Sequence, residues 1–530
     1  MNYDYIVAGG GSAGCVVATR LVRERGARVL LVERGRRRSP WLLGVPAGYT
    51  KFLAGDPVLE MHHTVAQPAL DGRGPIVPQA RLLGGGSAVN AMVYMRGQHE
   101  DYDGWDRFLG GASGWSYADM LPHFRAMEHN ARLKDEYHGS EGPLWVSDPG
   151  HTCAMTHAFI AAARASGVPA NPDFNGARQN GVGLMQNTIG GGKRCSAVRA
   201  FLSQVFDDPR LHLVTEAQVT RILFERGRAA GIEYADRSGV HQARAGSEVL
   251  LSCGTYNTAK LMMISGVGPA AELQRHGIGV VHDAPGVGQN LQDHHEVPLI
   301  ATTRGAYGYY GEDRGWRMLR NGLRYLLFGS GPAATMGVEA CLFHDPDGGP
   351  RPTIQLYCVP SIYVDRDLGG ITPTHGLTLT SCLLRPRARG WVRLRSADPA
   401  EPPLVNANFF GDPDDARLEI AALRHARRLL QQAPLAGMVE AELLPGAQHE
   451  SDEALRTHCN RTVKTNYHPV GTARMGPDGD PMAVLDTKLR VRGVEGLRVI
   501  DCSAIPLIPS GNTNAPALAL AHRAVEFIPA

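Results

Sequence analysis

The stretch of sequence that decides the fold is YDYIVAGGGSAGCVVATRLVRERGARVLLVE, residues 3–33. An apolar run at 5–8 leads into the pattern GxGxxG at 9–14, residues 15–21 have helical apolar spacing, and a second apolar run follows at 29–32. Strand, glycine turn, helix and strand in this order are typical of a dinucleotide-binding βαβ unit. We therefore expect a doubly wound α/β domain that includes this end of the chain.

The small residues of this turn have predicted roles in holding a nucleotide. The first glycine permits a tight turn, the second lets backbone N–H groups approach a pyrophosphate, and the third lets the helix pack closely on the strand. The N-terminus of the helix then offers partial positive charge to the phosphates. Glu33 lies at the distance where a carboxylate binds ribose hydroxyls, although the pattern alone admits NAD as well as FAD. The residues predicted to bind here are Gly9, Gly11, Ser12, Ala13, Gly14 and Glu33.

Composition excludes several classes of protein. The 530 residues are too many for a small disulfide scaffold, and the nine cysteines are scattered without a CxxC pair, so we expect reduced thiols. The 54 Lys and Arg against 52 Asp and Glu leave a formal net charge of +2, which gives no overall field to attract nucleic acid. No apolar run reaches the roughly 18 residues that span a bilayer. We expect a cytoplasmic protein with no transmembrane segment; peripheral membrane attachment and the oligomeric state are left open.

The middle of the chain differs from its two ends. Alternating runs at 353–359 and 377–384, broken by Pro and Gly, suit an antiparallel sheet, whereas 497–500 and 516–528 suit a strand and a helix. We expect an α/β protein whose Rossmann-like cofactor domain is assembled from both ends of the chain. A second, α+β domain would have a mainly antiparallel sheet with covering helices. The predicted boundaries are 1–150, 200–297 and 462–530 for the cofactor domain, and 151–199 and 298–461 for the substrate domain.

A second glycine cluster, ARLLGGGSAVN at 80–90, is a place where main chain lies against something flat or anionic. With its continuation to Asp103 it resembles the first signature of the glucose-methanol-choline (GMC) flavoprotein oxidoreductases. GTYNTAKLMMISGVG at 254–268 is similar to their second signature, except that Ala259 stands where the family prefers Pro or Ser. PGVGQNLQDH at 285–294 and the segment 484–506 are also family-like, so the resemblance covers nearly the full chain.

The resemblance implies that the cofactor is FAD. It implies that Val219 contacts the adenine through its backbone and that Asp501 binds the phosphate or ribityl portion. Asn90 stands at or next to the position where some relatives carry a histidine linked covalently to the flavin, so we expect noncovalent FAD. The further cofactor-binding residues implied in this way are Arg81, Gly85, Gly86, Asn90, Val93, Val219, Asp501, Asn512 and Thr513.

The resemblance also implies where catalysis takes place. His468, in NYHPVGT at 466–472, matches the general base of the family, and Asn512 matches its second active-site residue. An alcohol is too weak an acid to lose its proton unaided at neutral pH. A neutral imidazole accepts that proton as hydride leaves carbon for flavin N5, and such help is worth about 10² to 10⁴ in rate.

The helix expected near the C-terminus would assist the cofactor. Pro516 suits its first turn, with Thr513 or Asn514 as the cap. By the family resemblance, its N-terminus points at the pyrimidine edge of the flavin, where partial positive charge would stabilise the anionic reduced form.

Other patterns receive plainer interpretations. The pairs at 62–63 and 294–295 are adjacent histidines, which point to opposite faces of a strand and have no suitably spaced Cys or carboxylate partner, so we expect no metal. The arginines that follow Glu33 are interpreted as a solvated loop, because Glu33 would repel a ribose phosphate. Asn514 is interpreted as a capping residue only.

The sequence therefore predicts an FAD-dependent enzyme that oxidises a primary alcohol to the aldehyde. Two blocks, NPDFNG at 171–176 and LRPRARG at 384–390, are most similar to those of bacterial L-sorbose, polyethylene-glycol and other primary alcohol dehydrogenases. The expected substrate is a sugar, polyol or small alcohol, with aryl and furanic alcohols left open. The electron acceptor is a quinone or dye-like carrier or O2. A hydrogen-peroxide-producing oxidase, a flavin-containing hydroxynitrile lyase and a noncatalytic FAD-binding protein remain as alternatives.

Overall fold

The predicted βαβ unit is formed by β1 (Asn2–Ala8), α1 (Ser12–Arg25) and β2 (Val29–Glu33). The computed structural model describes residues 2–52, 55–363 and 371–529. Within it β1 and β2 are parallel, with Tyr5 opposite Val29 and Ala8 opposite Val32. Every side chain of β2 is buried, as expected for a central strand of a sheet that is covered on both faces.

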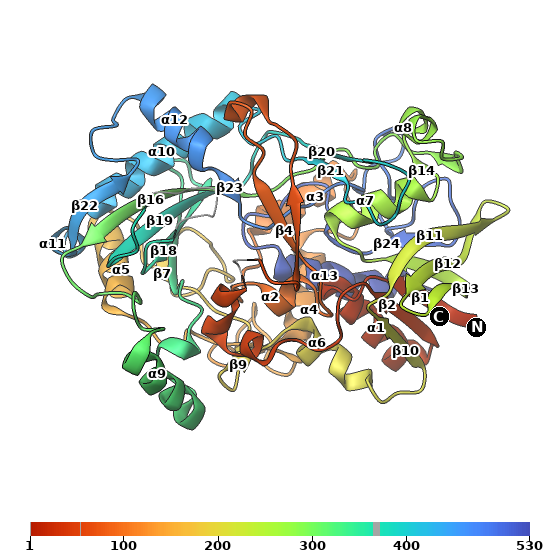
Figure 1. Cartoon of the computed structure of the whole chain (residues 1–530), viewed down its shortest axis with the longest axis horizontal. Coiled ribbons are helices and arrows are strands. Elements are labelled where there is room, and N and C mark those ends of the chain that lie inside the picture. Colours follow the sequence, from red (N-terminus) through yellow and green to blue (C-terminus); the bar gives the residue numbers. More distant parts are fainter. Residues whose placement is uncertain (1, 53–54, 364–370, 530) are drawn as a thin grey trace.

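The first sheet has the strand order β10-β2-β1-β13-β12-β11, with β24 also paired to β13. β10, β2, β1, β13 and β24 run parallel, whereas β12 and β11 form an antiparallel extension. The strand nearest the C-terminus thus pairs in the same sheet as β1, which places both ends of the chain in this lobe (Figure 1). The additional strands are β10 (Leu211–Thr215), β11 (Gln218–Glu225), β12 (Arg228–Asp236), β13 (Gly239–Leu251) and β24 (Leu497–Val499).

The second sheet has the order β22-β16-β19-β18-β17-β7, with β23 also paired to β16, and all of these pairs are antiparallel. The expected strands at 353–359 and 377–384 are present. Their alternating pattern is typical of a sheet with one face in solvent, but β19 is buried along its whole length. The strands are β7 (Gly181–Leu184), β16 (His295–Thr303), β17 (Ala340–His344), β18 (Ile354–Val359), β19 (Gly376–Leu383), β22 (Val439–Leu444) and β23 (Lys464–Thr465).

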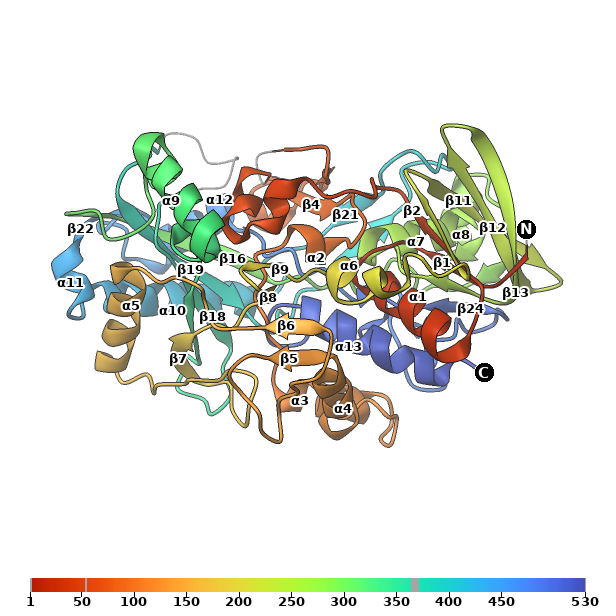
Figure 2. The same cartoon turned by 90° about the horizontal axis from the view of Figure 1, so that it is seen from below.

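Helices cover the sheets and join the two lobes. In the first lobe α13 packs beside α1, and in the second α10 packs against β19 (Figures 1 and 2). α13 has Thr513 as its N-cap and Pro516 as its third residue, close to the arrangement expected from the sequence. The helices of eight or more residues, besides α1, are α3 (His99–Phe108), α4 (Tyr117–Met127), α5 (Ala154–Ala165), α7 (Thr255–Ile264), α9 (Gly315–Phe328), α10 (Pro413–Leu430), α12 (Asp452–Thr462) and α13 (Asn514–Ala524).

Shorter elements occupy the connections. They include α2 (Gly86–Val89), α6 (Ala197–Ala200), α8 (Ala270–Arg275) and α11 (Leu435–Met438). Small two-stranded sheets are formed by the pairs β3 (Leu59–His63) with β4 (Ile76–Ala80), β5 (Glu128–Asn130) with β6 (Leu144–Val146), β8 (Ile189–Gly190) with β9 (Lys193–Arg194), β14 (Val267–Gly268) with β15 (His282–Asp283), and β20 (Trp391–Arg393) with β21 (Leu404–Asn406). In the described ranges no helix combines the length and apolar character needed to cross a bilayer.

Candidate active site

A cavity of about 1220 Å³ extends from the glycine turn of the βαβ unit to residues of the second sheet. Its wall includes all but two of the residues predicted to bind cofactor or substrate; the exceptions are Gly14 and Arg81. The structure therefore brings together residues from the N-terminal turn, the second glycine cluster and the segment 466–514. The predicted residues that line the cavity are Gly9, Gly11, Ser12, Ala13, Glu33, Gly85, Gly86, Asn90, Val93, Val219, His468, Asp501, Asn512 and Thr513.

The glycine end of the cavity has the shape that a dinucleotide phosphate requires. Gly9 has φ +102°, and a Cβ on Gly14 would lie 2.0 Å from the Gly9 carbonyl oxygen, so the turn and the first turn of α1 fit only without side chains there. A Cβ on Gly85 would lie 2.8 Å from Gly11 Cα, which shows how closely the second glycine cluster approaches the first. Among the described residues, no side chain caps the N-terminus of α1. Its first N–H groups thus remain available to an anion, which fits the pyrophosphate of FAD.

Two buried carboxylates lie along the same end. Glu33 accepts hydrogen bonds from the backbone N–H of Gly10 at 2.8 Å and of Gly35 at 2.6 Å. Asp501 accepts from the backbone N–H of Gly254 at 2.9 Å and from the Thr258 hydroxyl at 2.6 Å, so it also orients the start of α7. Burial raises the pKa of both carboxyls.

The remaining predicted cofactor residues differ in position. Arg81 is exposed and lies outside the cavity wall. Gly14 lies in the first turn of α1 against the Gly9 carbonyl, where it contributes close packing and is not part of the cavity wall. Asn90 lines the cavity with its side-chain oxygen held by the Met92 backbone N–H at 3.0 Å and by Arg194 at 2.8 Å. An amide fixed in this way has no nucleophilic atom to offer a flavin.

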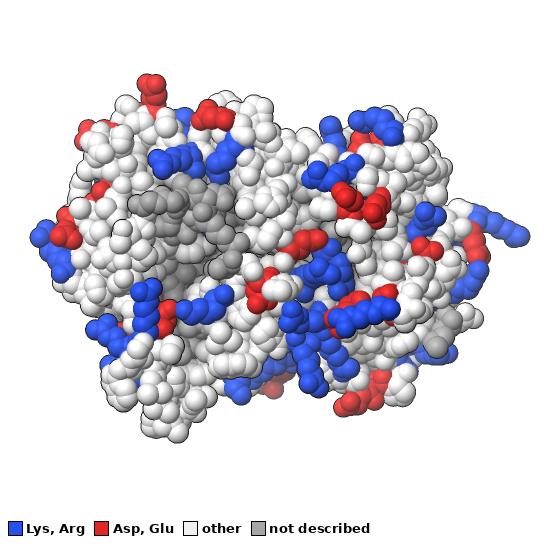
Figure 3. All heavy atoms as spheres, in the orientation of Figure 1, with Lys and Arg blue, Asp and Glu red and all other residues white. Residues whose placement is uncertain are grey.

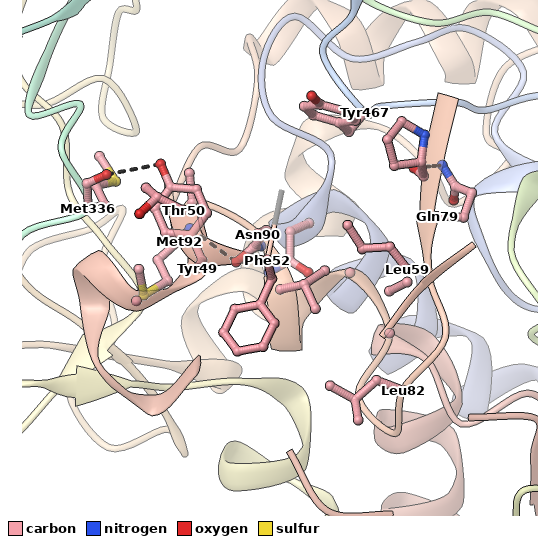
Figure 4. Close-up of a pocket in the computed structure, with 18 of the residues that line it drawn as sticks. Tyr49, Thr50, Phe52, Leu59, Gln79, Leu82, Asn90, Met92, Met336 and Tyr467 are labelled. Carbon is pink, nitrogen blue, oxygen red and sulfur yellow. Dashed lines mark hydrogen bonds between the residues drawn. The ribbon is translucent and has the colours of Figure 1, made fainter. Parts of the chain in front are cut away.

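The opposite end of the cavity is partly apolar. Figure 4 shows Tyr49, Met92 and Met336 close together on one side, where the Tyr49 hydroxyl donates to the Met336 carbonyl at 3.0 Å. Tyr467 lies apart from them, toward Gln79.

His468 lies in this cavity, and its backbone N–H and both of its ring nitrogens have hydrogen-bond partners. Its backbone N–H donates to Asp293 at 2.9 Å, its Nδ1 lies 3.0 Å from His294 Nδ1, and its Nε2 lies 3.3 Å from Asn512 Nδ2. The two imidazole rings are nearly perpendicular, at 89°. The base and the second active-site residue predicted from the sequence are therefore neighbours, although 44 positions separate them.

The hydrogen bonds fix which nitrogen of His468 is free to accept a proton. His294 Nε2 lies 2.9 Å from the Leu384 carbonyl oxygen, which only accepts, so His294 carries its proton on Nε2. Burial lowers the pKa of His294 to about 4, so the ring is neutral at pH 7 and its Nδ1 is an acceptor. His468 must then donate from Nδ1. The lone pair of His468 is consequently on Nε2, beside Asn512.

Burial also keeps His468 in the state that a general base needs. The side chain is only 8% exposed, and desolvation, with a smaller contribution from His294, lowers the pKa of His468 well below its usual value. Asn512 is oriented in turn: its Nδ2 faces His468, and its Oδ1 accepts from the Tyr357 hydroxyl at 3.3 Å. Asn512 can therefore donate to an oxygen that lies beside both its amide nitrogen and His468 Nε2.

The site contains residues that sequence reasoning did not assign. His294 was considered only as half of a histidine pair, and Tyr357 and Glu296 were not singled out. His294 lies in the family-like block at 285–294, which was the available signal for it; Tyr357 and Glu296 had none. Within the described ranges no group of three or more His, Cys, Asp or Glu is arranged to hold an ion.

Comparison with known proteins identifies the family. Residues 3–296 match one GMC oxidoreductase domain and residues 386–521 match the other. The chain belongs to the GMC oxidoreductase family. It is 38% identical to the alcohol dehydrogenase (acceptor) of Pseudomonas putida in an alignment that covers 99% of this chain and 95% of that protein. It is also 38% identical to the mitochondrial choline dehydrogenase of Mus musculus, with 99% and 89% covered.

Solved structures of GMC oxidoreductases have the same architecture. Pyridoxine 4-oxidase from Mesorbium loti superimposes with a TM-score of 0.90 at 28% identity, covering 99% of this chain and 98% of that one. GMC oxidoreductases are FAD-dependent flavoproteins, and the cradle at Gly9, Gly11 and Gly85 fits that cofactor. This protein is accordingly an FAD-dependent oxidoreductase that acts on alcohol-type donors.

Proposed function

We propose that the protein oxidises an uncharged primary alcohol to the aldehyde, with His468 as the general base. The observation that carries the proposal is the chain of contacts from the Leu384 carbonyl through His294 to His468, which leaves the lone pair of His468 on Nε2 beside Asn512. A neutral, oriented imidazole next to an amide donor is suited to a hydroxyl group that loses its proton.

In this proposal the protein handles the proton and the oxygen. The substrate hydroxyl donates its proton to His468 Nε2, and the Asn512 amide donates a hydrogen bond to the substrate oxygen as negative charge develops there. The positive charge that forms on His468 is shared through Nδ1–H with the neutral His294 ring. FAD, when bound at the glycine end of the cavity, supplies the acceptor for the hydride of the carbinol carbon.

A buried ion pair with one member, Glu296, in the cavity wall supports the proposed substrate class. Glu296 lines the wall, and its carboxylate lies 2.5 Å from Lys464 Nζ. That ammonium group also lies 4.5 Å from the ring centre of Tyr363 and 5.5 Å from that of Tyr467. A carboxylate with two aromatic rings is the environment that binds a substrate ammonium group. Here a lysine of the chain itself occupies it.

The ion pair of Glu296 and Lys464 is the argument against choline, the substrate named for the choline dehydrogenase relatives. Choline carries a permanent quaternary ammonium, which would have to displace Lys464 from a buried ion pair and two aromatic rings. Breaking a buried pair by adding a like charge is costly. We therefore propose sugars, polyols and small or aryl alcohols without charge as substrates, and a poor rate with choline.

The electron acceptor is also part of the proposal. The name of the Pseudomonas putida relative specifies a separate acceptor, which favours a dehydrogenase that passes electrons to a quinone or dye-like carrier over one that uses O2. Comparing turnover in air with anaerobic turnover on a quinone distinguishes the two, since an oxidase produces hydrogen peroxide in air.

The test of the proposed function is anaerobic flavin reduction. The FAD-loaded protein is mixed with sugars, polyols, linear and aryl primary alcohols, and choline, and bleaching of the flavin band is followed by stopped flow. We expect bleaching by at least one uncharged alcohol and slower bleaching by choline. If no alcohol bleaches the flavin, the noncatalytic or lyase alternatives replace the oxidation; if choline is the fastest substrate, the assignment of Glu296 and Lys464 is wrong.

A further inference from the structure

Helix α9 carries apolar side chains into solvent. In Figure 1 it stands out from the body of the molecule below the second sheet. Trp316 is 71% exposed, and Leu326 and Phe328 are each 75% exposed. Five of the exposed apolar residues recur at helical spacing and form one stripe along α9, which we call the apolar stripe; Met318 and Phe328 lie off it. Its members are Trp316, Leu319, Leu323, Leu326 and Leu327.

A basic stripe runs beside the apolar stripe. Arg317, Arg320 and Arg324 follow the same spacing of three and four residues, and the sequence of α9 contains no Asp or Glu. Two acids precede the helix: Glu312 lies 3.4 Å from Arg317 and 3.1 Å from Arg320, and Asp313 lies 2.5 Å from Lys51. Figure 3 shows Lys and Arg side chains beside the uncharged tip of this protrusion.

The side of α9 that faces the protein carries the polar residues Asn321 and Tyr325, with Met318 beside them in the cavity wall. Asn321 is buried and donates to Glu312 at 2.7 Å, and the Tyr325 hydroxyl donates to the Gly192 carbonyl at 2.9 Å. A surface helix that serves only the fold turns its apolar side inward and its polar side to water. α9 has the reverse arrangement: its apolar stripe is exposed, and no described residue of the chain buries it.

We propose that α9 docks the protein on the surface of an anionic lipid bilayer. Trp and Leu on one side with arginines on the flank is the composition of helices that lie in the plane of the membrane interface. The arginines would meet the negative lipid headgroups while the apolar stripe enters the acyl boundary. A second copy of the chain fits less well, because a two-fold interface brings the same stripe of arginines from both copies together.

Docking through α9 would place the cavity next to the bilayer. Met318, Asn321 and Leu326 belong both to α9 and to the cavity wall. A substrate or electron acceptor dissolved in lipid could then pass from the bilayer to the cavity without crossing water. The inference goes beyond the oxidation chemistry and does not depend on the role of His468.

Vesicle sedimentation tests the docking. The FAD-loaded protein is mixed with vesicles of phosphatidylcholine alone or of phosphatidylcholine with phosphatidylglycerol. We expect binding to the anionic vesicles, weakened by high salt, and a loss of affinity of about tenfold or more in the variant Trp316→Gln/Leu319→Gln/Leu323→Gln. These three residues lie outside the cavity wall, so turnover of a water-soluble alcohol by this variant serves as the control for folding. Val240→Gln, an exposed apolar site on β13 in the other lobe, should bind vesicles as the parent does.

A fluorescence measurement locates the contact. Brominated lipids should quench part of the tryptophan emission of the bound protein, and Trp316→Phe should reduce that quenched part while retaining vesicle binding. The proposal is overturned if the parent protein does not sediment with anionic vesicles, or if the triple variant sediments as well as the parent. It is also overturned if the triple variant converts a dimer to a monomer in sedimentation velocity without changing vesicle binding.

Discussion

The Nδ1 atoms of His294 and His468 lie 3.0 Å apart, in rings that meet at 89°. This contact, together with the bond from His294 to the Leu384 carbonyl, makes the proton of His294 determine the tautomer of His468. The Leu384 carbonyl, acting through His294, therefore determines which nitrogen of His468, the proposed base, is reactive. Four predictions follow from this and neighbouring geometry.

Removing the proposed base should slow reduction of the flavin. In His468→Ala the substrate hydroxyl has no acceptor for its proton, so we expect the rate constant for anaerobic reduction to fall by about 10² to 10⁴. His63→Ala, at an exposed histidine on β3, is the matched control and should retain the parental rate. Both proteins should contain FAD in the parental ratio. An unchanged rate in His468→Ala would remove this residue from the mechanism.

Removing the orienting ring should lower the rate by a different route. In His294→Phe no acceptor faces His468 Nδ1, so the ring is free to carry its proton on Nε2, where it cannot act as a base. We expect kcat to fall by about 10- to 100-fold, the cost typical of losing the partner that orients a functional histidine. His294→Gln presents a carbonyl oxygen that can accept from Nδ1–H and should restore part of the rate. Equal losses in Phe and Gln variants would show that His294 acts only through packing.

Removing the charge of Lys464, the partner of Glu296, should change substrate preference. In Lys464→Gln the Glu296 carboxylate and the rings of Tyr363 and Tyr467 lose the ammonium group that they now hold. We expect reduction of the flavin by choline to increase by about tenfold relative to an uncharged alcohol, which is about 1.4 kcal/mol of discrimination. The control is Glu296→Gln/Lys464→Gln, where the carboxylate is absent as well and the gain should disappear. If the rate of flavin reduction by choline relative to an uncharged alcohol does not change, Glu296 and Lys464 do not determine substrate selection.

A side chain at the third glycine of the turn should impair FAD binding. In Gly14→Ala the new Cβ would lie 2.0 Å from the Gly9 carbonyl oxygen, so α1 must move away from the strand. Overpacking of this kind costs about 1 to 3 kcal/mol of stability. The ratio of flavin to protein absorbance should fall and the melting temperature should decrease. Gly437→Ala in α11, where a Cβ meets no atom within 4 Å and φ is ordinary, is the control. Full FAD content in Gly14→Ala would contradict the packing argument.

The local sequence pattern predicted the parts of the fold that depend on residues close together in the sequence. The spacing of apolar residues, and the glycines and prolines that interrupt it, decide these elements. They are the glycine turn, α1, β2 and the two alternating runs of the second sheet. The convergence of His468 with Asn512 rested on the family resemblance, since no spacing rule links residues 44 positions apart. The boundaries of the two domains remain predictions.

The rest of the site depends on contacts between distant segments. Glu296 meets Lys464 because β16 pairs with β23, and strand pairing between segments so far apart has no local signal. The tautomer of His468 depends on Leu384, which follows β19, and on His294, which precedes β16. The exposed apolar stripe of α9 was also missed, because a helix with apolar residues at this spacing normally turns them inward.

β24 lies near the C-terminus in the sequence but belongs to the same sheet as β1, the first strand of the chain. β1, β13 and β24 belong to one sheet, and Asp501 and Thr513 stand at the cavity with the glycine turn. The ribosome makes the first of these segments long before the last. The complete nucleotide pocket therefore exists only after residues 497–524 have been made and have joined the glycine turn at the other end of the chain.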